Sequence, residues 1–261
     1  MDLSLHGRHA LVGGASRGIG RATAIVLAEL GASVTLMARS RDALEQARSG
    51  LVNGADQSHG VCVADASQPG EVGTAVAEIA SRSAIHIVVN NTGGPPGGPA
   101  HAAGLEEYEM AFRQHVLCSQ AILHAVLPGM TEAGFGRIVN VISTSVKQPI
   151  PNLGVSNTVR GAMASWAKTL ASELGPRGIT VNNVLPGFTE TDRLAAIIES
   201  RAGKTGSSAD EVAKAMKSAV PLRRFAQASE TADAIAFLVS PAAAYINGVS
   251  LAVDGGRTNA L

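Results

Sequence analysis

The chain has 261 residues, of which 46% are apolar and 16% are charged, and this composition predicts a globular protein with a large buried core. The formal net charge is zero and no basic run stands out, which argues against a nucleic-acid partner or a membrane-surface role. The N-terminus does not read as a signal peptide and no stretch reaches the ~20 apolar residues of a membrane span, so we expect a soluble, cytoplasmic protein. The two cysteines, Cys62 and Cys118, are isolated and are expected to be reduced, buried and structural.

Short apolar runs alternate with longer helical patterns along the chain. Strands are predicted over residues 9–14, 33–38, 60–65, 85–90, 136–143, 178–186 and 248–256. Helices are predicted over residues 18–30, 41–49, 69–82, 105–132, 153–174 and 229–239, and a polar, alanine-rich segment at 188–220 is helical but less regular. Apolar strands without alternation, each followed by a helix, are typical of a parallel sheet covered on both faces.

No linker, repeat or low-complexity tract divides this pattern. We therefore predict a single α/β domain over residues 1–261, built as a Rossmann-type doubly wound parallel sheet of about seven strands with helices on both faces. The segment at about 188–220 is predicted to be a mobile substrate lid.

The segment "GGASRGIGRATA" links the first predicted strand to the first predicted helix. Gly14, Gly18 and Gly20 in it are spaced so that the backbone can turn tightly and approach a phosphate closely. The start of the following helix supplies free N–H groups and the positive end of the helix dipole. The segment predicts a dinucleotide-binding loop, which also includes Ser16 and Ile19.

The end of the second strand bears on the choice of nucleotide. Enzymes that prefer NAD usually carry an acidic residue here, whereas this chain has Ala38 followed by Arg39. Together with Arg17 in the glycine loop, Arg39 suits the 2′-phosphate of NADP (NADPH), so NAD is the less favoured cofactor. The alternative is that both arginines are solvated surface residues. Asp65 is expected near the adenine amino group, with Ala66 beside it, although an aspartate there also forms ordinary turns.

Five segments together resemble the short-chain dehydrogenase/reductase family nearly from end to end. They are "GASRGIG", "NNTG" at 90–93, "RIVNVIS", "NNVLPGFTETD" and "YINGVSLAVDGG", the last resembling 3-oxoacyl-carrier-protein reductases. The resemblance implies further cofactor contacts, which we expect at Asn91, Gly93, Pro186, Gly187, Thr189 and Thr191.

The family's catalytic residues are an asparagine, a serine, a tyrosine that acts as general acid and a lysine that lowers the pKa of the tyrosine and holds the nicotinamide ribose. Counting back from "ASEL" puts Arg160 at the lysine position and Ser156 at the tyrosine position. Ser143 keeps the family's serine spacing, and counting back from "LPGM" puts His115 at the asparagine position. The resemblance therefore implies a catalytic group in which only the serine is the usual residue.

These replacements change the expected chemistry. A serine hydroxyl is a far weaker acid than a tyrosine phenol, whose pKa is about 10, and an arginine with a pKa above ~12 does not pass protons at neutral pH. Arg160 is therefore expected to bind the ribose rather than to transfer protons. His115, with an ordinary pKa of ~6.5, is a candidate proton donor or acceptor, and the alternative is that it only fills the space of the asparagine.

We predict an NADP(H)-dependent oxidoreductase with an atypical proton donor that reduces a carbonyl compound, with a 3-oxoacyl thioester suggested by the resemblance, or oxidises the matching alcohol. The alternatives are a dinucleotide-binding protein without redox turnover and a non-redox lyase, isomerase or cyclase on the same scaffold. No metal site is predicted. The apolar helix over 153–174, paired with the helix over 105–132, predicts a homotetramer or homodimer.

Overall fold

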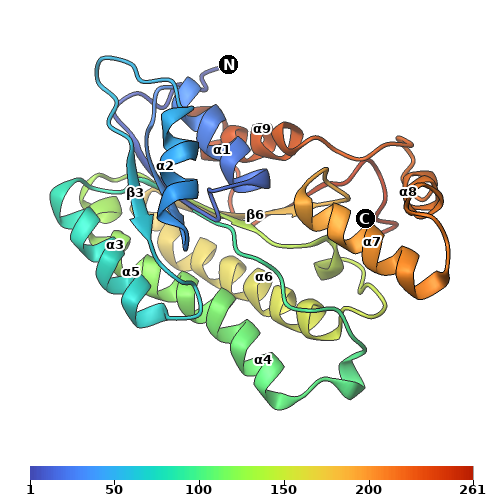
Figure 1. Ribbon diagram of the computed structural model, residues 1–261. Helices are drawn as coiled ribbons and strands as arrows, with labels where there is room; N and C mark the ends of the chain where they lie inside the picture. Colours follow the sequence, from blue (N-terminus) through green and yellow to red (C-terminus); the bar gives the residue numbers. More distant parts are fainter. Residues whose placement is uncertain (261) are drawn as a thin grey trace.

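The computed structural model describes residues 1–260, and at its centre lies a seven-stranded sheet in which every pair of neighbours is parallel (Figure 1). Its spatial order is β3-β2-β1-β4-β5-β6-β7. The strands are β1 (His9–Gly13), β2 (Ser33–Ala38), β3 (Gly60–Val63), β4 (Ile87–Asn90), β5 (Gly136–Val141), β6 (Ile179–Pro186) and β7 (Ser250–Val253). The order reverses between β1 and β4, so the crevice for a ligand is expected beyond the carboxyl ends of these two strands.

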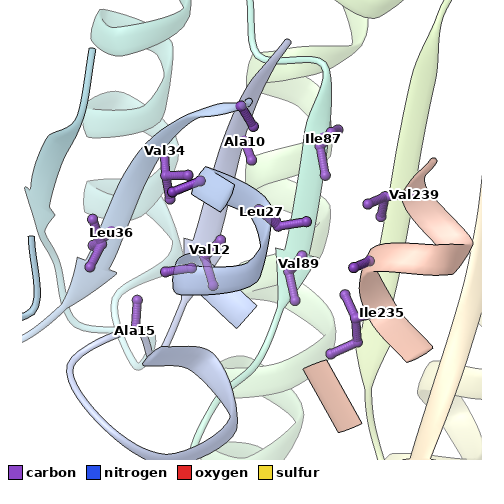
Figure 2. Close-up of a cluster of buried hydrophobic side chains, with 14 of the residues drawn as sticks. Ala10, Val12, Ala15, Leu27, Val34, Leu36, Ile87, Val89, Ile235 and Val239 are labelled. Atoms are coloured by element: carbon purple, nitrogen blue, oxygen red, sulfur yellow. The ribbon is translucent and has the colours of Figure 1, made fainter. Parts of the chain in front are cut away.

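Helices cover both faces of the sheet, as the sequence predicts. One face carries α1 (Gly18–Glu29), α2 (Arg41–Ser49) and α9 (Ala228–Val239), and the other carries α3 (Pro69–Arg82), α5 (Cys118–Glu132) and α6 (Gly154–Leu174). Figure 2 shows the first face, where apolar side chains of β1, β2 and β4 pack against those of α1 and α9. Cys62 and Cys118 are free and buried in the core of the second face, which confirms their predicted burial.

Several predicted strands end earlier than expected, and two of these ends belong to the candidate site. The third strand stops at Val63 rather than 65, and the fifth stops at Val141 rather than 143. The Asp65 carboxylate accepts a hydrogen bond from the Ser67 N–H at 2.9 Å, and Ser143 Oγ accepts one from the Ser145 N–H at 3.1 Å. These local bonds compete with the strand ladder and turn the chain into loops.

The long helix predicted over 105–132 has that extent but is not uniform. It consists of α4 (Leu105–Phe112), a π-helical segment (Arg113–Leu117) and α5. A π turn widens the helix by one residue and often occurs at functional sites. His115 lies at the centre of this segment, where it is buried.

The segment predicted as a lid forms two helices at the carboxyl-terminal side of the sheet, α7 (Asp192–Thr205) and α8 (Ala209–Ser218) (Figure 1). They pack around a small apolar cluster of their own, made of Leu194, Met216 and Phe225. Whether this segment opens and closes stays a prediction. Within residues 1–260, no helix has the length and apolar character that a membrane crossing needs.

A line of polar side chains crosses the buried part of the sheet. Asn90, Asn140 and Asn183 are register partners on β4, β5 and β6. Asn90 donates to Asn140 Oδ1 at 2.8 Å, and Asn140 donates to Asn183 Oδ1 at 2.9 Å. Asn183 in turn donates to Ser250 Oγ on β7 at 3.1 Å. Each buried amide is thereby paired, which offsets the cost of burying it.

Candidate active site

The glycine loop after β1 has the geometry of a phosphate cradle. Gly14 and Gly18 adopt positive φ angles of 57° and 56°, which side chains other than glycine rarely tolerate. A Cβ at position 20 would collide with the carbonyl oxygen of Gly14. Helix α1 starts directly after the loop with no side-chain cap and no acidic residue in its first turn. Its first N–H groups are therefore free to bind an anion, and the loop fits a dinucleotide phosphate.

Other predicted cofactor residues surround this loop. Asn91 donates from Nδ2 to the Gly13 carbonyl at 3.1 Å and so joins the carboxyl ends of β1 and β4. Ile19 packs against the core beneath the loop, whereas Ser16 is half-buried and Gly93 is exposed with no atom within 4 Å of where its Cβ would be.

The start of α7 leans against the glycine loop. The Thr191 methyl group lies 3.2 Å from the position of a Gly18 Cβ, and Arg17 Nη1 lies 3.4 Å from Asp192 Oδ2. Both partners of this ion pair are largely exposed, so the pair adds little stability and is easily exchanged for a ligand phosphate.

The end of β6 positions the remaining predicted cofactor residues. The Gly187 N–H donates to the Val253 carbonyl at 2.9 Å, so Pro186 and Gly187 are fixed beside β7. Thr189 is buried and forms a bridge to Ala226.

The residues predicted to lie near the adenosine are more exposed to solvent. Arg39 is exposed after β2, and Ala66 is half-buried against the core. Hydrogen bonds from the Ser67 backbone, together with the charge of Arg39, hold the pKa of Asp65 below its ordinary value. Asp65 therefore forms a turn and remains a carboxylate close to Arg39, and its expected contact with the adenine amino group stays a prediction.

Each of the four predicted catalytic residues has a direct sequence neighbour in one shared apolar cluster. Val116, Ile142, Val155 and Val159 all belong to this buried cluster, which joins the π-helical segment, the end of β5 and α6. Each of these residues is the direct neighbour in sequence of one predicted catalytic residue, namely His115, Ser143, Ser156 and Arg160.

His115 is only 3% exposed, and Nδ1 lies 2.6 Å from Thr92 Oγ1. Its Nε2 is buried without a hydrogen-bond partner. Burial, together with the charges of Arg160 and Arg193, lowers the pKa of His115 to about 2. The ordinary pKa assumed from the sequence therefore does not apply, and the imidazole is neutral at neutral pH. It can position a hydroxyl group but does not hold a spare proton.

Arg160 lies on α6 and is 7% exposed. Its Nη1 donates to the Val141 carbonyl at 3.0 Å, which fixes the guanidinium beneath the end of β5. Burial and the neighbouring charge of Arg193 lower the pKa of Arg160 to about 10, so it stays charged at neutral pH. The remaining donors of its fork are available to ribose hydroxyls, as predicted for this position.

The two serines differ in their surroundings. Ser143 Oγ accepts from the Ser145 N–H and keeps its own proton for another acceptor. Ser156 is half-buried on α6, close to where the glycine- and proline-rich loop at 91–104 is attached. There, the Gly98 N–H donates a hydrogen bond to the Asn152 carbonyl at 2.8 Å, and the Gly154 N–H donates one to the Gly98 carbonyl at 2.9 Å. The loop forms a wall near Ser156.

Two functional candidates escape the sequence reasoning. Thr92 is the third residue of the "NNTG" segment, and its Oγ1 contacts His115 Nδ1. Arg193, on α7, donates to the Gly94 carbonyl at 3.3 Å and to the Pro95 carbonyl at 3.5 Å. The only signal for Arg193 in the sequence is a cation directly after "FTETD", which looks like an ordinary surface residue.

The family model described as Enoyl-(Acyl carrier protein) reductase matches residues 14–258. The chain belongs to the short-chain dehydrogenase/reductase family. It is 34% identical to the 3-oxoacyl-[acyl-carrier-protein] reductase FabG of Vibrio cholerae over 97% of this chain and 98% of that protein. It is 28% identical to the NADPH-dependent reductase BacG of Bacillus subtilis over 97% of this chain and 99% of that protein.

Solved structures agree with this membership. The L-sorbose reductase of Gluconobacter frateurii, solved as a complex with NADPH and L-sorbose, superposes with a TM-score of 0.93 at 28% identity over 100% of both chains. The fold and family predicted from the sequence are thereby confirmed. The roles of Ser143, Ser156, Arg160 and His115 stay predictions.

Proposed function

We propose that this family member is an NADP(H)-dependent oxidoreductase that reduces a small carbonyl compound or oxidises the matching alcohol. The observation that carries the proposal is the glycine cradle at the uncapped start of α1 combined with the buried charge of Arg160 at the lysine position. The absence of an acidic side chain at Ala38 and the exposed Arg39 support NADP over NAD. Two similar proteins carry NADPH in their names or in their solved complex.

The bound cofactor would supply or accept a hydride, and the chain would supply binding and orientation. The cradle and Arg39 would hold the phosphates, and Arg160 would hold the nicotinamide ribose. Ser143 would donate its hydroxyl proton in a hydrogen bond to the substrate oxygen. His115 would stay neutral and would hold the Thr92 hydroxyl in place through their hydrogen bond.

The missing phenol determines how a proton would reach the product. Ser156 is too weak an acid to replace a tyrosine, and neutral His115 holds no spare proton. We infer that water delivers the proton, while Ser143 and the charge of Arg160 stabilise the negative charge that develops on the substrate oxygen. This arrangement favours carbonyl compounds that are already activated.

The test mixes the purified protein with NADPH and a panel of carbonyl compounds and follows the nicotinamide absorbance. Substrate-dependent oxidation of NADPH is expected, and Ser143→Ala and Arg160→Ala should reduce it. Tight NADPH binding without turnover on any compound would contradict the proposal and favour a dinucleotide-binding protein. Product formation without a change in the nicotinamide would favour the non-redox alternative.

We further propose that the active form is a homodimer or homotetramer. A groove of about 420 Å³ runs between α4, the π-helical segment and α6, and its lining includes Tyr108, Phe112 and Leu117. Phe112 and Leu117 are 40% and 41% exposed, and Met110 of the same helix is 59% exposed. A second copy that presents the same helices would cover this apolar face through a two-fold, self-complementary contact. A cytoplasmic location also stays a prediction.

A further inference from the structure

Two guanidinium groups meet at one point of the crevice. A Cβ added to Gly94 would lie 3.0 Å from Arg193 Nη2 and 3.6 Å from Arg160 Nη2. Both nitrogens therefore lie around the same small space, which the missing side chain of Gly94 leaves open. Since a carboxylate accepts hydrogen bonds at about 2.9 Å through two separate oxygens, one carboxylate can contact both groups.

No acidic side chain neutralises this pair. Among residues 1–260, neither Arg160 nor Arg193 forms an ion pair with a carboxylate, and the bonds they make to protein go to backbone carbonyl groups. Arg160 is 7% exposed, so its charge is removed from most of the water that would otherwise stabilise it. Two like charges without a counter-charge, one of them buried, form a ready-made site for an anion.

The position of Arg193 places this site on the substrate side of the crevice. Asp192 turns toward the glycine loop and pairs with Arg17, whereas Arg193 turns toward Gly94 and Pro95. The loop at 91–104 is fixed at Gly98 to the start of α6, where Ser156 lies. Arg193 therefore contacts the same loop that is attached beside Ser156, the residue at the family's tyrosine position.

We propose that Arg193 Nη2 and Arg160 Nη2 bind the carboxylate of the substrate, that Nε of Arg160 stays available to the nicotinamide ribose, and that the substrate is a small oxo acid or the matching hydroxy acid. This assignment rests on the proposed oxidoreductase function and narrows it to acidic compounds rather than neutral thioesters. In the reduction, the carbonyl carbon receives a hydride from the reduced nicotinamide, the carbonyl oxygen takes a proton from water, and the carboxylate is unchanged.

The experiment compares three small oxo acids, pyruvate, 2-oxobutanoate and acetoacetate, with their methyl esters, using NADPH and the full-length protein. The parent should prefer at least one acid to its ester in kcat/KM. Arg193→Gln should raise KM for that acid about 10- to 100-fold, as expected for a charge-assisted hydrogen bond, and leave the ester unchanged. Arg193→Lys should recover part of the loss, and Arg201→Gln, an equal charge change on the same exposed helix, should have no effect.

Gly94→Ala tests the same space independently. Its added methyl group fills the gap between the two guanidinium groups, so KM for the acid should rise without loss of either charge. Binding is measured in parallel by titrating each acid into the NADPH-loaded protein in a calorimeter, which does not depend on turnover.

The outcomes separate this proposal from the function on which it rests. Esters reduced as well as the acids, or an acid preference that persists in Arg193→Gln, would overturn the carboxylate site while leaving the oxidoreductase intact. Loss of NADPH affinity in Arg193→Gln with an unchanged acid preference would show that Arg193 binds a cofactor phosphate, and would also overturn it. Acid binding that depends on Arg193, without any turnover, would support the anion site and defeat the redox function. No binding of any of the three acids would refute the site.

Discussion

The neutral, buried state of His115 makes the stability of the protein depend on pH in a way that can be calculated. Its pKa in the folded protein is about 2, against an ordinary value of 6.5 in the unfolded chain. Below pH 6.5, His115 binds a proton in the unfolded chain but not in the folded protein. The stability associated with neutral His115 is therefore fully present above pH 6.5 and is lost as the pH falls from there toward 2.

The magnitude follows from the linkage between proton binding and folding. A proton bound only by the unfolded chain costs about 1.4 kcal/mol of unfolding free energy per pH unit. Between pH 7 and pH 5, the protonation of His115 in the unfolded chain should lower the free energy of unfolding by about 2 kcal/mol. Its side chain is only 3% exposed, so solvent screening reduces this effect little. The pKa values of His9 and His86 are also lowered by burial, so they add a background that falls in the same direction.

Urea unfolding followed by circular dichroism at pH 7, 6 and 5, at constant protein concentration, measures this effect. His115→Asn removes the titrating group but keeps a polar side chain, so the variant should lose about 2 kcal/mol less than the parent over this range. His101→Asn, at an exposed histidine, should behave as the parent does. If the parent and His115→Asn lose the same stability, His115 accepts a proton in the folded protein and the reasoning on its burial is wrong.

Three further predictions concern the cofactor, the proton donor and the assembly. Arg39→Ala should weaken NADP(H) binding by about 1–3 kcal/mol in calorimetric titrations, and equal affinity of the parent for NAD(H) would contradict the cofactor assignment. The double variant Ser156→Tyr with Arg160→Lys should reduce simple activated ketones faster than the parent, since a phenol near an ammonium can transfer a proton; a slower variant that still binds NADPH would mean that the wall at 91–104 leaves no room for the ring. Light scattering at micromolar concentration should give a dimer or tetramer mass, and Phe112→Glu should shift it toward the monomer, whereas a monomeric parent would disprove the apolar interface.

Much of the fold and of the cofactor cradle is predictable because it depends on local rules. Gly14 and Gly18 are needed where φ is positive, and a run of buried, non-alternating strands identifies a parallel sheet. The predicted catalytic positions rest on spacing along single elements, since Ser156 and Arg160 are one turn apart on α6, and their roles stay predictions.

The properties of the site depend on contacts between distant segments and are not visible in the sequence. The sequence predicts one continuous helix over 105–132, so periodicity does not reveal the π turn at His115. The low pKa of His115 arises from burial and from Arg160 and Arg193, which approach it only in the folded chain. For the same reason, the contacts of Arg193 with Gly94 and Pro95, which are about a hundred residues away in sequence, have no local signal.

The line of asparagines across the sheet also fixes the register of the strands that end at the crevice. Asn90 directly precedes Asn91, Asn140 lies three residues before Ser143, and Asn183 lies three residues before Pro186. Every amide donates in the same direction, from β4 toward β7, so a slip of β5 or β6 by a single residue would break bonds on both sides of that strand. The bonds therefore fix the register of β4, β5 and β6 relative to one another, and with it the positions of the residues that follow these strands. The predicted catalytic residues at 115, 156 and 160 lie on helical elements rather than on these strands, so their chemistry can differ while the strands keep their register.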